Sequence, residues 1–237
     1  MRAKKSLGQN FIKNRNLLEK EANLAGIKDK VVLEIGAGDG RLSEILIKKC
    51  PKKLFLVELD SELADVLKKK FAEKENVEVI AGDFLKLEPF PVDVIFGNIP
   101  YYISSKIIFR LLEWDFESAV LIVQKEFGEK MVANPGDSNY GRLSVTSQIC
   151  FEVKKGFVIP KENFFPKPKV DSIAIILKKK RKLSEWEERV IRELYAHKNK
   201  TVENALKKIP AEIPERLRKK RPRHMSIEEV LSIKPKQ

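Results

Sequence analysis

Short apolar runs alternate with helical patterns along the first two-thirds of the chain, and this alternation restricts the fold more than any other feature. The intervening segments, such as Arg41–Cys50 and Leu63–Phe71, have one apolar face at helical spacing. The five expected strands are Val31–Ile35, Leu54–Val57, Val77–Ile80, Val92–Phe96 and Ala119–Val123. Strands that are apolar throughout and separated by helices are typical of a parallel sheet covered on both faces. We therefore expect an α/β fold with a Rossmann-like sheet.

The last quarter of the chain has a different pattern. Ser172–Leu177 resembles a final sheet strand, and a run of five basic residues follows it at 178–182. Glu185–His197 and Lys200–Ile209 have helical periodicity, and prolines divide the remainder into short pieces. We expect residues 1–177 to form the sheet domain and residues 178–237 to form a small, basic, helical C-terminal domain.

The charge balance indicates a polyanionic partner. Lys and Arg number 47 against 34 Asp and Glu, a formal net charge of +13. Residues 178–237 hold 19 of these basic residues and 9 of the acidic ones, so most of the surplus lies there. A thermophilic composition would explain the abundance of lysine and glutamate, but not the bias in sign. RNA or DNA is the partner that such a field attracts most often.

Several classes of protein are disfavoured. No apolar stretch approaches the roughly 18 residues of a membrane helix, and the basic N-terminal segment lacks the apolar core of a secretory signal. Cys50 and Cys150 have no Cys or His neighbours at the spacing of a zinc site. We expect a soluble, cytoplasmic, monomeric protein that requires no metal.

Polar groups stand where the expected strands end, and ligands of such sheets bind beyond the carboxyl ends of the strands. The first strand leads into Glu34-Ile-Gly36-Ala-Gly38-Asp-Gly40. This loop lacks the third glycine of a dinucleotide fingerprint, and no triphosphate-binding P-loop occurs. Glu58, at the end of the second strand, can accept hydrogen bonds from both hydroxyls of a ribose. The alternative is a solvated acid that begins the next helix.

The third strand is followed by Gly82-Asp83-Phe84. Asp83 can accept a hydrogen bond from an exocyclic amine, and Phe84 can lie along the face of a purine. Taken alone, Asp83 is more typical of a helix cap. With the glycine loop and Glu58, three consecutive strand ends indicate an adenosine ligand without a triphosphate.

The fourth strand ends in Asn98-Ile99-Pro100-Tyr101, the most specific motif of the chain. Asn-x-Pro-Tyr resembles the signature of methyltransferases that act on exocyclic amines. The lone pair of an adenine amine is delocalised into the ring, and acceptors for its two N–H groups restore electron density at nitrogen. The Asn98 side-chain oxygen and the Ile99 carbonyl are suited to this task, and Tyr101 to stacking on an extruded base. A structural turn is the alternative for the bare tetrapeptide.

Together these motifs make the chain similar to the KsgA-type small-subunit ribosomal RNA adenine dimethyltransferases, relatives of the Erm resistance enzymes. The matching segments are Leu7–Phe11, Glu34–Gly38, Glu58–Asp60, Gly82–Asp83, Asn98–Ser104, Gln124–Glu126, Tyr140–Ser144 and Phe164–Ser172. The resemblance implies a class I methyltransferase fold with S-adenosylmethionine as donor. It also implies dimethylation of the N6 amines of two adjacent adenosines near the 3′ end of small-subunit rRNA, during small-subunit biogenesis.

The resemblance also assigns residues. Around the donor it places Asn10, Ile12, Gly36, Gly38, Glu58, Asp83 and Asn98. It gives Asn98, Ile99 and Tyr101 catalytic roles, and it stacks the target adenine between Tyr101 and Phe164, although Phe164 could equally be a core residue beside Phe165. Two other functions remain open: methylation of a large-subunit rRNA adenine or of DNA, and a non-catalytic factor that binds nucleic acid on the same fold.

Overall fold

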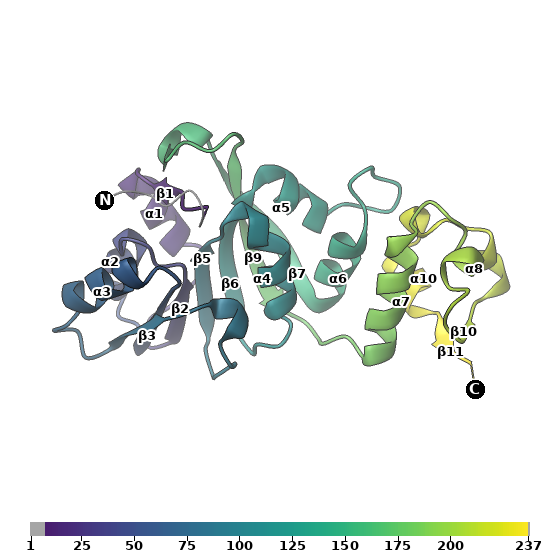
Figure 1. Cartoon of the computed structure of the whole chain (residues 1–237), viewed down its shortest axis with the longest axis horizontal. Coiled ribbons are helices and arrows are strands. Elements are labelled where there is room, and N and C mark those ends of the chain that lie inside the picture. The colour runs from purple at the N-terminus through teal and green to yellow at the C-terminus, as the bar shows by residue number, and fades with distance from the viewer. Residues whose placement is uncertain (1–7, 237) are drawn as a thin grey trace. The chain divides into compact units, whose positions relative to one another are not determined.

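A seven-stranded sheet in the order β4-β3-β2-β5-β6-β9-β7 forms the centre of the computed structural model, which describes residues 8–236 (Figure 1). Its strands are β2 (Val31–Ile35), β3 (Lys53–Glu58), β4 (Val77–Ala81), β5 (Val94–Asn98), β6 (Ser118–Gln124), β7 (Phe151–Ile159) and β9 (Ser172–Lys179). Strands β4, β3, β2, β5 and β6 are parallel, and β9 runs antiparallel to β6. All five strands predicted from the alternation are present, with bounds shifted by no more than two residues.

The alternation of apolar runs did not predict β7, and the reason lies in its burial. Phe151 and Ile159 at its ends are buried, but Lys154, Lys155 and Gly156 between them are exposed. An edge strand with one side open to solvent needs no continuous apolar run. Because β9 runs antiparallel to β6, the sheet is mixed rather than wholly parallel.

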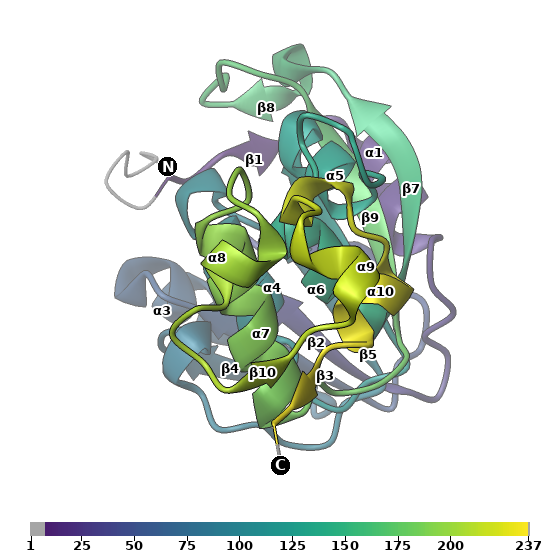
Figure 2. The ribbon, with the colours of Figure 1, turned by 90° about the vertical axis from the view of Figure 1, so that its right-hand side faces the viewer.

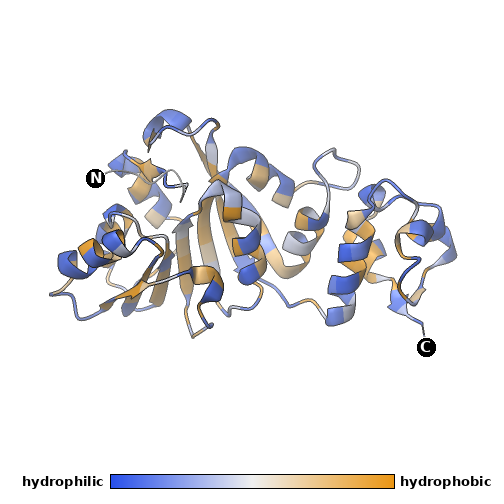
Figure 3. Cartoon of the chain, in the orientation of Figure 1, coloured by the Kyte–Doolittle hydropathy of each residue, from blue (hydrophilic) through white to orange (hydrophobic). Residues whose placement is uncertain are grey.

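Helices cover both faces of the sheet. On one face, α1 (Arg15–Ala22), α2 (Arg41–Ile47) and α3 (Ser61–Lys70) pack their apolar sides on alternate strand residues in a single core. On the other face lies α5 (Lys125–Met131), where a Cβ on Gly128 would stand 2.6 Å from the Ile173 side chain. Figure 3 shows apolar residues on the strands and hydrophilic residues on the outer sides of the helices. A further helix, α4 (Ser104–Arg110), follows the short 3-10 helix η3 (Tyr101–Ile103).

A two-stranded ribbon brings the N-terminal segment to residues far along the chain (Figure 2). Strand β1 (Phe11–Ile12) pairs antiparallel with β8 (Phe164–Phe165), so that Ile12 lies opposite Phe164 and Phe11 opposite Phe165. Successive side chains of a strand point to opposite faces. Ile12 and Phe164 are accordingly buried in the core, while Phe165 is exposed.

The chain divides into two compact units, one of residues up to 128 with 154–179, the other of residues 129–153 with those from 180 onward. The expected boundary at 178 lies beside the division at 180. Residues 129–153, however, which we expected in the sheet domain, group with the C-terminal residues. Tyr140 gives one physical reason, because its ring is buried and its hydroxyl donates a 2.8 Å hydrogen bond to the Met225 carbonyl oxygen.

Short helices make up the second unit. They are α6 (Arg142–Cys150), α7 (Glu185–Ala196), α8 (Val202–Ala205), α9 (Glu215–Arg218) and α10 (Ile227–Leu231), with a small ribbon of β10 (Ala211–Glu212) and β11 (Lys234–Pro235). Capping boxes begin α7 at Ser184 and α10 at Ser226. The helix expected over Lys200–Ile209 shortens to α8. No helix of residues 8–236 has the length and apolar character to cross a membrane.

Candidate active site

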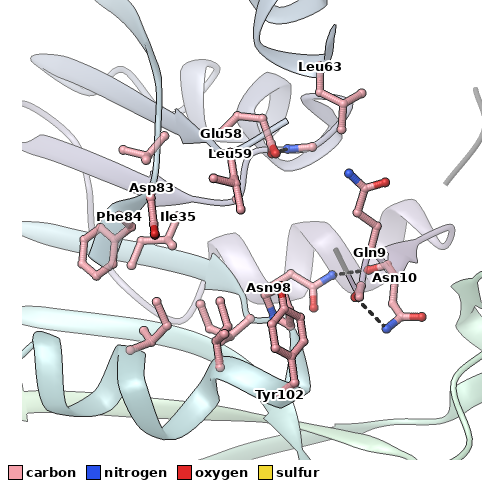
Figure 4. Close-up of a pocket in the computed structure, with 18 of the residues that line it drawn as sticks. Gln9, Asn10, Ile35, Glu58, Leu59, Leu63, Asp83, Phe84, Asn98 and Tyr102 are labelled. Carbon is pink, nitrogen blue, oxygen red and sulfur yellow. Dashed lines mark hydrogen bonds between the residues drawn. The ribbon is translucent and has the colours of Figure 1, made fainter. Parts of the chain in front are cut away.

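A pocket lies where four neighbouring parallel strands end (Figure 4). Across the sheet, residues at or just after the ends of β4, β3, β2 and β5 line it in the order Asp83, Glu58, Gly36 and Asn98. Three interstrand steps separate the outer two, about 14 Å at the usual spacing. About 830 Å³ of space free of protein atoms lies in this pocket, and this figure includes open solvent.

The turn after β2 has a backbone that only glycine adopts readily. Gly36 and Gly38 have φ values of +71° and +61°. A Cβ on Gly38 would come 2.7 Å from the Phe11 ring, whereas one on Gly36 would meet no atom within 4 Å. The N-terminal segment therefore packs closely on the loop at Gly38, and the space beside Gly36 is open to a ligand.

Glu58 holds the glycine loop from the next strand. Its Oε2 accepts a 2.8 Å hydrogen bond from the Gly38 N–H, and its Oε1 accepts one of 2.9 Å from the Asp60 N–H. Burial raises the pKa of this carboxyl, and the two backbone donors oppose that rise. Each carboxylate oxygen keeps a second lone pair. Glu58 can thus stabilise the loop and accept ligand hydroxyls at once.

Two further carboxyls lie buried behind the loop. Glu34, at 3% exposure, accepts a 2.6 Å hydrogen bond from the Ser43 hydroxyl. Burial, with the negative charges of Glu58 and Asp39, raises its pKa to about 8. Glu21 on α1 is completely buried, and burial raises its pKa well above the usual value. Glu34 therefore remains largely protonated near neutral pH.

Asp83 has the helix-capping role that the sequence suggests and also lies at the pocket. Its Oδ1 accepts a 3.0 Å hydrogen bond from the Leu85 N–H and so caps the 3-10 helix η2 (Phe84–Lys86), while the residue also lines the pocket. Phe84 beside it stacks on Trp114, with ring centroids 5.1 Å apart and planes at 27°. The ring of Phe84 is held in place by this stacking at the Asp83 end of the pocket.

Asn98 lies at the other end, where the N-terminal segment passes over the strand. Its Nδ2 donates a 2.6 Å hydrogen bond to the Asn10 carbonyl oxygen. No donor among residues 8–236 reaches its Oδ1, which leaves that oxygen as an acceptor for a ligand. The neighbouring Tyr101 is half-buried, and its hydroxyl exchanges a 2.8 Å hydrogen bond with Ser172.

The structure brings eight of the ten predicted site residues to the pocket: Asn10, Gly36, Gly38, Glu58, Asp83, Asn98, Ile99 and Tyr101. Ile12 and Phe164 do not line it. Their side chains are 3% and 1% exposed and face the core, as their shared register in the β1–β8 ribbon requires. The backbone carbonyl oxygen of Ile12 accepts a 3.5 Å hydrogen bond from an Arg41 side-chain nitrogen. Leu7, the first residue of the N-terminal motif, lies outside the described residues.

Gln9, Leu59 and Tyr102 are among the lining residues that were absent from the predicted site. Leu59 and Tyr102 are 50% and 61% exposed, unusual for apolar side chains. Their positions directly after Glu58 and Tyr101, at two strand ends, are the signal that could have identified them. No group of three His, Cys, Asp or Glu residues in the described part of the chain is arranged to hold a metal ion.

The parallel sheet, the glycine turn after its first strand, the acid after its second and Asn-x-Pro-Tyr after its fourth define a class I S-adenosylmethionine-dependent methyltransferase. The pocket fits S-adenosylmethionine. Glu58 keeps unused lone pairs beside an open glycine turn, and hydrogen-bond acceptors lie at both ends of the pocket. The model of the ribosomal RNA adenine dimethylase family matches residues 1–234, and the chain belongs to this family.

Individual proteins are also similar to this chain in sequence or in structure. The chain is 37% identical to a probable ribosomal RNA small subunit methyltransferase A of Methanopyrus kandleri, over 98% of this chain and 91% of that protein. A dimethyladenosine transferase of Plasmodium falciparum has a similar structure, with a TM-score of 0.82, 31% identity and coverage of 93% and 94%. The 23S rRNA methyltransferase ErmE matches with a TM-score of 0.73, 27% identity and coverage of 93% and 96%.

Proposed function

We propose that this protein transfers methyl groups from S-adenosylmethionine to the N6 amines of two adjacent adenosines near the 3′ end of small-subunit rRNA, giving N6,N6-dimethyladenosines. The observation that carries the proposal is the orientation of Asn98. Its amide N–H is held by the Asn10 carbonyl, so its Oδ1 is presented to the pocket. Family membership and the name of the Methanopyrus kandleri relative support the same reaction.

The order of residues across the sheet supports one direction for the donor. Asp83 and Phe84 offer an acceptor and an aromatic edge for a purine, Glu58 offers acceptors for the ribose hydroxyls, and the glycine turn lies beyond them. The remaining end of the pocket belongs to Asn98. An adenosine bound at the Asp83 end would therefore direct the rest of the donor toward Asn98.

S-adenosylmethionine supplies a methyl group already activated on a sulfonium centre, so the protein contributes mainly positioning and electrostatics. Asn98 Oδ1 and the Ile99 carbonyl accept the two N–H groups of the target amine and direct its lone pair toward the methyl carbon. Tyr101 supports one face of the base. Because Pro100 precedes Tyr101 in a fixed turn, the acceptor pair and the ring keep one relative geometry.

The basic surplus of residues 178–237 supports RNA as the partner. Several of its cations, such as Arg181 with Glu187 and Lys220 with Glu229, are already ion-paired. Others, including Lys207, Lys208 and Lys219, are exposed and make no ion pair with any described residue. We propose that such lysines contact rRNA phosphates within an immature small subunit, a partner that this protein binds as a monomer.

A second candidate is methylation of a large-subunit rRNA adenine, which the structural similarity to ErmE favours. The higher TM-score of the dimethyladenosine transferase and the small-subunit name of the Methanopyrus kandleri relative favour the first candidate.

The test is incubation of the purified protein and labelled donor with immature small subunits, naked small-subunit rRNA, mature small subunits and large-subunit rRNA in parallel. We expect label in immature small subunits, at two neighbouring N6,N6-dimethyladenosines located by nuclease digestion and mass spectrometry. Label confined to large-subunit rRNA would support the second candidate. Donor binding without transfer to any RNA would contradict both.

A further inference from the structure

The segment Phe164–Ser172 is one of those that match the rRNA adenine dimethyltransferases in sequence, yet it contributes no residue to the pocket lining. Its two ends are nevertheless fully buried, Phe164 at 1% exposure and Ser172 at 0%. Between them the backbone is fixed at Asp171, whose Oδ1 accepts a 3.0 Å hydrogen bond from the Lys161 N–H. The Asp171 carbonyl oxygen also accepts one of 3.0 Å from the Lys125 N–H. The segment is therefore anchored close to its end at Ser172.

Ser172 acts on the pocket through Tyr101. The two hydroxyl oxygens are 2.8 Å apart, and either can donate. Burial raises the pKa of Tyr101, so its phenol remains neutral at physiological pH and retains its proton for this bond. The hydroxyl oxygen lies at the far end of the ring, so a hydrogen bond there fixes the position of that end relative to the backbone of Tyr101. Ser172 therefore holds the far end of the ring in place.

The other end of the segment acts on Asn98. Phe164 pairs with Ile12, and the Lys13 N–H donates a 2.8 Å hydrogen bond to the Asn163 carbonyl. These contacts place the N-terminal segment across the end of β5. Two residues before Ile12, the Asn10 carbonyl accepts the Asn98 side-chain N–H at 2.6 Å. Both polar residues of Asn-x-Pro-Tyr thus depend on the same segment, one through each end.

We infer that Phe164–Ser172 positions the base-binding residues and that Ser172 is a positioning residue for methyl transfer, acting only through the Tyr101 hydroxyl. This inference rests on the proposed function, in which Tyr101 supports the target base. Without the hydrogen bond, the far end of the ring moves away from the position that supports the base, and the target amine loses its alignment with the methyl carbon. The turnover rate then falls while donor affinity is retained.

A double-mutant cycle tests the inference. Ser172→Ala, Tyr101→Phe and the double variant each lose the same hydrogen bond. We expect each to lower kcat on immature small subunits by about tenfold, a loss typical of a misplaced reacting group, with an unchanged dissociation constant for S-adenosylhomocysteine. The double variant should be no slower than either single variant. Ser147→Ala, at another fully buried serine whose hydroxyl has no hydrogen-bond partner among residues 8–236, is the matched control and should retain wild-type kcat.

A measurement that needs no turnover separates this inference from the proposed function. The chain has four tyrosines, so 3-fluorotyrosine labelling gives a simple fluorine NMR spectrum. The Tyr101 resonance is assigned by its absence in Tyr101→Phe. We expect Ser172→Ala to shift or broaden that resonance while leaving the other three in place.

The outcomes are distinct. Losses of kcat that multiply in the double variant would overturn the inference, as would a Tyr101 resonance unchanged by Ser172→Ala. A wild-type protein that methylates no rRNA would instead overturn the proposed function, and the NMR result would still decide whether Ser172 fixes the ring.

Discussion

The Asn98 side chain donates a 2.6 Å hydrogen bond through Nδ2 to the backbone carbonyl oxygen of Asn10, a residue 88 positions earlier in the chain. An asparagine amide has a donor end and an acceptor end, and a contact with a carbonyl oxygen distinguishes them. The donor end is held by the N-terminal segment, and no residue among 8–236 donates a hydrogen bond to the acceptor end of this pocket-lining residue. This contact makes the orientation of Asn98 a property of the folded chain before any substrate binds.

Replacing Asn98 should therefore abolish methylation without preventing RNA binding. We expect Asn98→Ala to lower kcat by at least about a hundredfold, the loss typical for one preorganised polar group. Asn98→Asp should fail too, because a carboxylate cannot donate to the Asn10 carbonyl. Initial rates with labelled donor and a filter-binding assay with rRNA measure the two effects. Near-wild-type turnover in Asn98→Ala would contradict the assigned role.

Glu58 should control donor affinity. Glu58→Ala removes the acceptor proposed for the ribose hydroxyls and leaves the Gly38 and Asp60 N–H groups without their partner. We expect the dissociation constant for S-adenosylhomocysteine, measured calorimetrically, to rise by roughly ten- to a hundredfold, as for a lost hydrogen bond to a charged group. Glu73→Ala, at an exposed acid just after α3, should leave it unchanged. Equal affinities of the two variants would exclude Glu58 from the donor site.

Tyr102 should contribute to RNA affinity. Its ring is 61% exposed at the pocket and contacts the N-terminal segment at Gly8. Such a ring can stack on a base next to the target, which is worth about 1–3 kcal/mol. Tyr102→Ala should raise KM for immature subunits by about tenfold or more with kcat retained, and Tyr102→Phe should preserve KM because it keeps the stacking face. A KM unaffected by Tyr102→Ala would rule out stacking.

The exposed lysines of the C-terminal residues should determine the salt dependence of RNA binding. Changing Lys207, Lys208 and Lys219 together to Gln removes up to three phosphate contacts and their counterion release. The slope of log affinity against log salt should then become shallower by about two to three units. Three lysines of the first unit, Lys28, Lys69 and Lys74, are exposed and provide a control with the same change in net charge. Equal slopes for the two triple variants would locate the RNA contacts elsewhere.

The free energy of unfolding should fall as pH rises from about 5 to 8, because Glu34 keeps its proton in the folded chain and loses it in the unfolded chain. Its pKa is raised from 4.5 to about 8 by burial and by Glu58 and Asp39, against the opposing effects of Ser43 and Lys70. Between these values the unfolded chain has lost a proton that the folded chain keeps, so unfolding becomes more favourable with pH, by at most about 1.4 kcal/mol per unit. Urea unfolding at several pH values measures this.

Glu34→Gln keeps an acceptor for Ser43 and removes the titration. We expect the variant to lose less stability than wild type over that range. Glu21 and Glu58 have pKa values shifted in the same direction and should leave some dependence in the variant. Identical pH dependence in the two proteins would mean that Glu34 ionises in the folded state as it does in the unfolded chain.

Most of the predicted site residues that line the pocket lie at strand ends. Gly36, Glu58, Asp83 and Asn98 each follow an apolar run, and parallel strands bring such ends to one edge of the sheet. Their proximity therefore follows from local periodicity together with a general rule of topology. Phe164 shows the limit of that approach. The core side of a two-residue strand depends on its pairing register with β1, which no local pattern reveals.

The sequence alone determined the parallel strands, the pocket edge and the types of group that line it, because apolar periodicity and turn residues act within a few positions of each other. Tertiary structure decided which end of the Asn98 amide bonds to the N-terminal segment, that Ser172 bonds to Tyr101, and that residues 129–153 join the C-terminal unit. Each of these depends on a contact between segments far apart in the chain. Such contacts form only when the whole sheet and its coverings pack together, and they leave no periodic signal in either segment.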